Sequence, residues 1–132
     1  MEPRTHLRAD PRLCGRLVQL GAGSARVALD AIDSMAVDAH GLIHGGFVFG
    51  LADYAAMLAV NDPNVVLAAA DTRFVKPVRR GDHVVASAYV VGAHDRKREV
   101  RVEATVGLEK VFEGTLTCFV PGQHVLGKVG NK

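Results

Sequence analysis

The sequence predicts an α+β fold in which a strongly curved antiparallel β-sheet wraps around one central helix. Three observations predict it: an apolar segment over residues 45–60, four strand-like segments after it, and two short strand-like segments before it. An apolar helix can be buried on most sides only when a sheet covers it, so the sheet must curl. The length of 132 residues fits one domain, which we expect over residues 13–121.

The segments before the central helix are short. Residues 1–12 are charged and interrupted by prolines, and we expect a flexible N-terminal arm there. Two β-like runs follow at residues 16–20 and 25–29, and the GAGS between them has the composition of a hairpin turn. Residues 31–43 are expected to form a loop or a short helical turn.

The central helix is expected from residue 45 to residue 60. Its Ala, Leu, Met and Phe residues favour helix over strand. Pro63 disfavours helix at the residue before it and ends the segment. Asp53 interrupts the apolar run, so no stretch reaches the roughly 18 apolar residues of a membrane span.

Four strands are expected after the helix. They cover residues 65–76, 83–93, 98–108 and 112–120, with turns at 94–97 and 109–110. In the third of them apolar and polar residues alternate, which is typical of a half-buried strand. Residues 122–132 are expected to form a flexible C-terminal tail.

The composition excludes several classes of function. A net charge of +2 and 5% aromatic residues without Trp argue against nucleic-acid binding. Cys14 and Cys118 lie far apart, so we expect two reduced thiols and neither a disulfide framework nor a zinc site. The N-terminus lacks the apolar core of a signal peptide. We therefore expect a soluble, cytoplasmic protein that binds neither nucleic acid nor membranes.

A polar motif opens the central helix. The stretch HGGFVFGLAD contains His44, Gly45 and Gly46, with Asp53 nine residues after the histidine. Glycines at a helix start leave backbone N–H groups unpaired and could stabilise an oxyanion, or they could simply permit a tight turn. Asp53 could be a general base or nucleophile, since apolar surroundings raise a carboxyl pKa, or a structural acid satisfied by a neighbouring group.

The motif and the order of the elements resemble the hotdog-fold thioesterase superfamily. The resemblance is to acyl-CoA thioesterases of the phenylacetyl-CoA type, which carry His-Gly-Gly followed by Asp, and ADTRFVKPVRRGD over residues 70–82 also fits them. It implies thioester hydrolysis with Asp53 activating water or attacking directly, the Gly45 amide in the oxyanion hole, and His44 orienting the loop. It implies no cofactor, because coenzyme A is part of the substrate.

Two positions depart from these relatives. Asp38 stands where they carry Asn, and Asp can accept hydrogen bonds but cannot donate an amide N–H. Leu67 and Ala68 stand where some of them carry an assisting Ser or Thr, and Thr72 is the nearest hydroxyl. We expect these departures to affect the turnover rate more than the fold.

A second resemblance gives an alternative function. Residues 71–120 resemble the hotdog effector domain of the malonyl-CoA-sensing repressor of bacterial lipid synthesis, which binds acyl thioesters without cleaving them. A non-catalytic module that binds acyl-CoA or an acyl carrier therefore stays open. A hotdog dehydratase fits less well, because such enzymes pair a catalytic His with an acid in another sequence context.

Basic residues after the helix are candidates for binding the phosphates of coenzyme A. A solvated basic loop explains each of them equally well. The predicted substrate-binding residues are Gly46, Asp38, Thr72, Arg73, Lys76, Arg79 and Arg80. His40 and His44 are four apart but precede the helix and lack a third ligand, so we expect no metal site. The other histidines, at positions 6, 83, 94 and 124, are scattered and expected on the surface.

The spacing within the motif requires two chains. Nine residues of helix rise about 13.5 Å. One carbonyl therefore cannot lie within about 3 Å of both the helix start and the Asp53 carboxylate of the same helix. The chemistry predicts a homodimer with two composite sites, and the resemblance implies the same, with dimers that can pair into tetramers.

Overall fold

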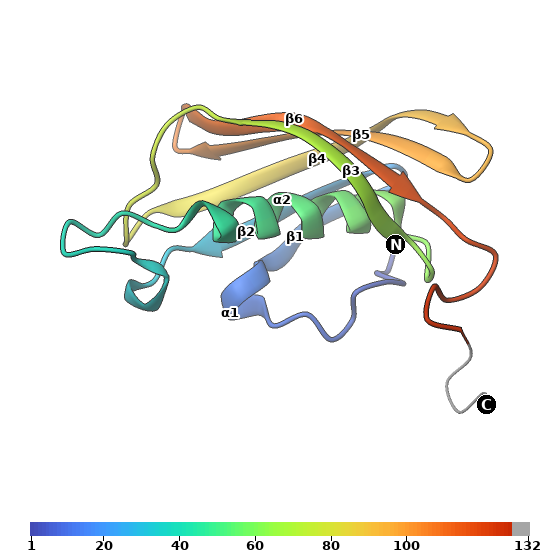
Figure 1. Cartoon of the computed structure of the whole chain (residues 1–132), viewed down its shortest axis with the longest axis horizontal. Coiled ribbons are helices and arrows are strands. Elements are labelled where there is room, and N and C mark those ends of the chain that lie inside the picture. The colour runs from blue at the N-terminus through green and yellow to red at the C-terminus, as the bar shows by residue number, and fades with distance from the viewer. Residues whose placement is uncertain (128–132) are drawn as a thin grey trace.

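The protein is a curled six-stranded antiparallel sheet with one long helix on its concave face (Figure 1). The structure is a computed structural model that describes residues 1–127. The strands are β1 (Arg16–Gly21), β2 (Ser24–Asp30), β3 (Val66–Phe74), β4 (His83–His94), β5 (Lys97–Val106) and β6 (Glu109–Phe119). The helices are α1 (Pro11–Cys14), a 3-10 turn (Asp33–Met35) and α2 (Gly45–Val60). This architecture confirms the predicted α+β fold class.

The sheet order is β1-β2-β4-β5-β6-β3, so β3 lies at one edge. It follows α2 directly in sequence but pairs with the last strand, with Leu67 opposite Cys118 and Phe74 opposite Phe112. A bulge interrupts this pairing between Leu67 and Ala69. Most side chains of β3 are exposed, and its second edge has no partner strand among residues 1–127.

The hydrophobic core lies between α2 and the concave face of the sheet. Inward residues of β2, β4, β5 and β6 are almost fully buried there, as in the alternating pattern predicted from the sequence. The buried residues of α2 include four alanines, which let the sheet approach the helix axis closely. They are Val48, Leu51, Ala52, Ala55, Ala56, Met57, Leu58 and Ala59.

Both ends of α2 fall where the sequence predicts them. His44 is the N-cap, and its side chain accepts a hydrogen bond from the Gly46 amide. Asn61 is the C-cap in the left-handed conformation, at φ 53°, a position at which Asn is one of the few tolerated residues. No helix among the described residues is both long and apolar enough to cross a membrane.

The structure corrects three details of the prediction. The turn between the last two strands lies at Gly107–Leu108 and not at residues 109–110, which belong to β6. Gly107 has φ +60°, and Leu108 is fully exposed, so the alternating pattern extends beyond the strand itself. β3 is shorter than the predicted strand over residues 65–76. The short helix α1, capped by Asp10 and opened by Pro11, was not predicted.

The N-terminal arm lies against the end of α2. The Arg4 amide donates to Asn61 Oδ1 at 2.7 Å, and Asn61 Nδ2 donates to the Glu2 carbonyl at 3.0 Å. Thr5 is only 4% exposed. Whether the arm is flexible stays a prediction, and so does the flexibility of the tail, whose residues 128–132 lie outside the described part of the chain.

Candidate active site

The start of α2 presents a free backbone donor beside an ordered histidine. His44 Nδ1 accepts the Gly46 N–H at 2.8 Å, so a neutral His44 ring carries its proton on Nε2. The Gly46 amide is therefore occupied, whereas no hydrogen bond within residues 1–127 engages the Gly45 amide. The helix dipole adds partial positive charge at this end. Gly45 is thus the donor best placed to bind an oxyanion.

Space at Gly45 is bounded by the end of β3. A Cβ atom added at Gly45 would lie 3.2 Å from Cε2 of Phe74. Phe74 packs edge-to-face on the buried Phe112, with ring centroids 5.2 Å apart. Because Gly45 has no side chain, its amide stays accessible although Phe74 is close. A tight turn would need such a glycine, and so would the approach of a carbonyl group.

Asp53 lies in the middle of the same helix with its carboxylate poorly satisfied. Its Oδ1 is buried and has no hydrogen-bond partner among the described residues. Burial raises the pKa of Asp53 above its usual value, and the nearby His6 opposes that shift. A structural acid would be expected to have a partner for this oxygen, because a buried unpaired carboxylate oxygen costs free energy. The arrangement suits a base or nucleophile.

Gly45 and Asp53 are eight residues apart in one continuous helix. At 1.5 Å per residue this places them about 12 Å apart along the helix axis. No small reacting group can contact both within one chain. Gly45 and Asp53 of one chain are therefore too far apart to act on the same carbonyl, and whether a site combines them from two chains stays a prediction.

Asp38 has a structural role in the loop before the helix. Its Oδ1 accepts the backbone amides of His40 at 3.0 Å and Leu42 at 3.2 Å. An Asn side chain offers the same acceptor oxygen, so the loop tolerates Asp or Asn here. Asp38 is exposed and points its hydrogen bonds into its own loop, and whether it contacts a substrate stays a prediction.

Two of the predicted basic residues lie beside the motif loop, the segment of residues 36–44 that leads into α2. The Arg80 amide donates to the Gly41 carbonyl at 2.9 Å, and Leu42 and Arg79 form an isolated β-bridge. The Arg80 guanidinium pairs with Asp33 at 2.7 Å. The Arg79 side chain forms none of the ion pairs of the described residues. The backbones of Arg79 and Arg80 thus lie beside the loop that leads into α2, and whether their charges bind a phosphate-bearing ligand stays a prediction.

The other predicted substrate-binding residues lie along and beyond β3. Thr72 faces Gly114, where an added Cβ would clash with the Thr72 side chain at 2.6 Å. Arg73 is opposite Glu113 in the sheet. Lys76 is held in an ion pair with Glu109. None of these contacts joins the three residues to Gly45 or Asp53, and their roles in binding substrate stay predictions.

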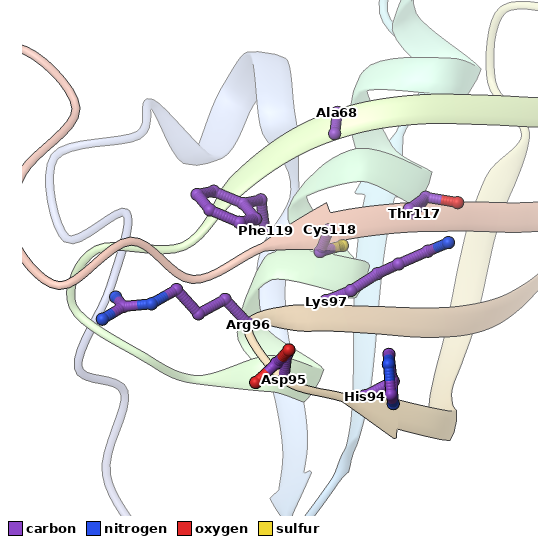
Figure 2. Close-up of a pocket in the computed structure, with 8 residues that line it drawn as sticks. All are labelled: Ala68, His94, Asp95, Arg96, Lys97, Thr117, Cys118 and Phe119. Carbon is purple, nitrogen blue, oxygen red and sulfur yellow. The ribbon is translucent and has the colours of Figure 1, made fainter.

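A cavity of about 540 Å³ lies at the turn between β4 and β5 (Figure 2). Figure 2 shows Arg96 and Lys97 extending from this turn in opposite directions, so their charges do not converge on one point. The residues that line the cavity are Ala68, His94, Asp95, Arg96, Lys97, Thr117, Cys118 and Phe119. None of the predicted catalytic residues lines this cavity. One lining residue, Cys118, is influenced by Asp53 on α2. Burial, and to a lesser extent Asp53, raises the pKa of the Cys118 thiol to about 12.

For three residues near Asp53 the sequence predicted no place beside the candidate site. Asp53 influences the pKa of His6, Cys14 and Cys118, which belong to the arm, α1 and β6. Only the folded chain brings these distant segments together, so no local pattern could have indicated them. Both cysteines are free thiols. Within residues 1–127, no group of three or more His, Cys, Asp or Glu side chains could hold a metal ion.

Comparison with known proteins identifies a family. The family model described as "Thioesterase superfamily" matches residues 40–111, which include the motif, α2, β3, β4 and β5. Among curated proteins, a methylthioribose-1-phosphate isomerase of Aquifex aeolicus is 49% identical over 114 residues, or 86% of this chain. The chain spans only 25% of that protein's length.

A transcription factor is also similar. The FapR protein of an Exiguobacterium species is 34% identical over 84 residues, which cover 63% of this chain and 44% of FapR. The chain therefore corresponds to less than half of the length of these two relatives.

Two solved structures support the fold over nearly the whole chain. An uncharacterized protein from Pyrococcus horikoshii is 48% identical, with a TM-score of 0.95, and the match covers 96% of this chain and 98% of that one. A mutant of the phenylacetic acid degradation protein PaaI from Thermus thermophilus is 32% identical, with a TM-score of 0.75 and coverage of 83% and 95%.

Proposed function

The chain belongs to the thioesterase superfamily, and from this premise we propose that it is an acyl-CoA thioesterase that works as a homodimer with two composite sites. The proposal depends on the half-buried Asp53 carboxylate, whose Oδ1 atom is buried and unpartnered among the described residues, on a helix that starts with a free Gly45 amide. The similarity to PaaI supports the same reading. The substrate would be a thioester of coenzyme A, and no further cofactor is needed.

The reaction uses two groups of opposite character. The thioester carbonyl oxygen accepts a hydrogen bond from the Gly45 amide, and the helix start stabilises the negative charge that develops on it. Asp53 of the other chain takes a proton from water as the water oxygen attacks the carbonyl carbon. The tetrahedral intermediate then expels the thiolate, which receives that proton and leaves as the free thiol. Alternatively, the Asp53 carboxylate attacks directly and water hydrolyses the resulting anhydride.

The free edge of β3 provides a route to such a dimer. An exposed, unpaired edge strand is a template for pairing with another chain. Phe74, at the end of β3, lies against Gly45. Leu67, near the start of β3, is opposite Cys118, and Asp53 influences the pKa of the Cys118 thiol. If two β3 strands pair antiparallel about their centres, the end of one meets the start of the other. The Gly45 of each chain is then brought toward the Asp53 of its mate.

The open face of α2 is consistent with this assembly. Gly46, Gly50 and Asp53 lie three or four residues apart on one side of the helix, and an added Cβ at Gly50 would meet no atom within 4 Å. A second copy of the helix could approach that side closely. The dimer is the smallest unit that completes a site, and pairing of two such dimers into a tetramer would leave that site unchanged.

Release of free thiol from a panel of straight-chain and aromatic acyl-CoAs tests the function. We expect the protein to release coenzyme A from some of them and Asp53→Asn to lower kcat by at least about 10²-fold, the usual contribution of a general base. Asn has nearly the same volume, and a normal circular dichroism spectrum would show that the variant is folded. Full activity of Asp53→Asn would exclude the mechanism.

The alternative function is an acyl-CoA or acyl-carrier binding module without hydrolysis. The similarity to FapR favours it, as does the presence of Leu67 and Ala68 where some relatives carry Ser or Thr. Calorimetric titration with the same acyl-CoAs, read beside thiol release, separates the two functions. Binding without release supports the module, whereas release supports the enzyme. For either function we propose a cytoplasmic location, where coenzyme A thioesters are available.

A further inference from the structure

A strap from the N-terminal arm, residues 2–6, crosses the end of α2 and reaches the region of Asp53. Asn61 ties it down with the two hydrogen bonds described above, one from the Arg4 amide and one to the Glu2 carbonyl. Thr5 is the one polar residue that is buried among the described residues. The strap is thus fixed at the C-cap of the helix and again at Thr5, one residue before His6.

His6 is held in a specific orientation at the end of this strap. Its backbone is in the left-handed region, with φ 54°, a conformation that few residues other than glycine adopt, His being with Asn and Asp among the enriched ones. Thr5 Oγ1 lies 2.8 Å from His6 Nδ1. The ring centroid lies 6.5 Å from that of Tyr54, the residue next to Asp53. One side of His6 stays exposed to solvent, so the ring can exchange protons with it.

We propose that His6 is a positioning residue for Asp53: the strap holds the imidazole close to the carboxylate so that its positive charge favours the ionised form of Asp53. The inference rests on the proposed function, in which ionised Asp53 is the reactive form. It adds to that function a second requirement, that residues 2–6 stay bound to the helix C-cap for full activity at mildly acidic pH.

Among residues 1–127, the other titratable groups around Asp53 are thiols and a phenol, which carry no positive charge. Cys14 on α1 and Tyr54 on α2 both have their pKa values raised, chiefly by burial. Cys118 on β6 has its pKa raised to about 12, also chiefly by burial, and stays a neutral thiol. Burial lowers the pKa of His6 below its usual value, although Asp53 opposes that shift, so His6 gains its positive charge on the acid side of neutrality.

Three variants separate charge from structure. His6→Gln removes the charge and keeps a polar side chain, whereas His6→Lys keeps a positive charge without the ring. Asn61→Gly removes both side-chain hydrogen bonds to the strap and retains a good C-cap, since Gly is the preferred residue in the left-handed conformation. A purely structural role of the His6 ring predicts the same effect for Gln and Lys, but a role of its charge predicts an upward shift of the Asp53 titration for Gln alone.

The readouts are the pH dependence of kcat/KM and the titration of the Asp53 carboxyl carbon by NMR. We expect the acid limb of the pH profile and the NMR titration to move to higher pH in His6→Gln and Asn61→Gly, and to stay in place or move lower in His6→Lys. An unchanged Asp53 titration in His6→Gln would overturn the proposal, as would the same shift for Gln and Lys.

The NMR titration of Asp53 does not depend on catalysis. If the wild-type protein cleaves no acyl-CoA, the proposed function fails, while the titration of Asp53 in the three variants still decides whether His6 acts on it. If hydrolysis is found but the titration is unmoved by His6→Gln, the function stands and this inference falls.

Discussion

Replacing Gly45 by Pro removes the one backbone N–H that the mechanism assigns to the oxyanion and leaves the helix start otherwise intact. Gly45 is the first residue of α2, the position where Pro is favoured because its missing N–H has no helical partner. The preceding His44 has φ −59° and ψ 129°, which is the conformation that a residue before Pro prefers. The variant should therefore fold.

Gly45→Ala is the matched control. Both substitutions add a Cβ that would lie 3.2 Å from Phe74 Cε2, and Phe74 is 56% exposed, so its ring can move aside. Only Pro removes the N–H. Loss of one oxyanion donor costs about 10²–10³-fold in kcat, or roughly 2.7–4 kcal/mol.

Steady-state thiol release gives kcat and KM for both variants. We expect Gly45→Ala to keep kcat within about tenfold of the wild type and Gly45→Pro to fall at least about 10²-fold below it. The reasoning would be refuted if the two variants had equal kcat values while both showed the helical content of the wild type.

Three further predictions concern stability and the motif loop. Burial raises the pKa of Asp53, so the folded state binds its proton more tightly than the unfolded state, and stability is lost as pH rises from the usual value of 3.8 through the folded pKa. Asp53→Asn should therefore raise Tm at pH 7 and lose this advantage below pH 3.8, and a lower Tm at pH 7 would contradict it. Phe112→Ala removes a fully buried ring that contacts Phe49 and Phe74, and should lower the free energy of unfolding in urea by about 3–5 kcal/mol. A loss under about 1 kcal/mol would show that Phe112 is not at the core of the fold. Asp38→Asn keeps the acceptor for two loop amides and should retain kcat/KM, whereas Asp38→Ala should lower it roughly fivefold, and equal kcat/KM values would show that the loop does not depend on these bonds.

The bounds of α2 and the succession of strands along the chain could be predicted because local physics determines them, whereas their order in the sheet could not. Two glycines after His44 and a proline at position 63 mark the helix ends, and an apolar segment with one charge implies burial on most sides. The alternation of apolar residues indicates which face of each strand is inside. It cannot show where a strand ends, which is why the sequence predicts the turn two residues after its actual place at Gly107–Leu108.

The neighbours of Asp53 could not be predicted because they depend on contacts between distant segments. The pairing of Glu2 and Arg4 with Asn61 joins residues more than fifty positions apart. His6 belongs to the segment that this pairing holds against α2. The sequence did contain one local signal that was missed, since Asp10 followed by Pro11 is a typical start of a helix.

The measurement that tests the composite site most directly mixes two inactive variants. In a mixed dimer of Gly45→Pro and Asp53→Asn chains, one site combines the intact Gly45 of the second chain with the intact Asp53 of the first, and the other site lacks both groups. Random assembly of equal amounts makes half of the dimers mixed, each with one working site of two, so we expect about a quarter of the wild-type activity. A mixture no more active than its inactive parents, in dimers shown to have exchanged chains, would contradict a site shared between subunits.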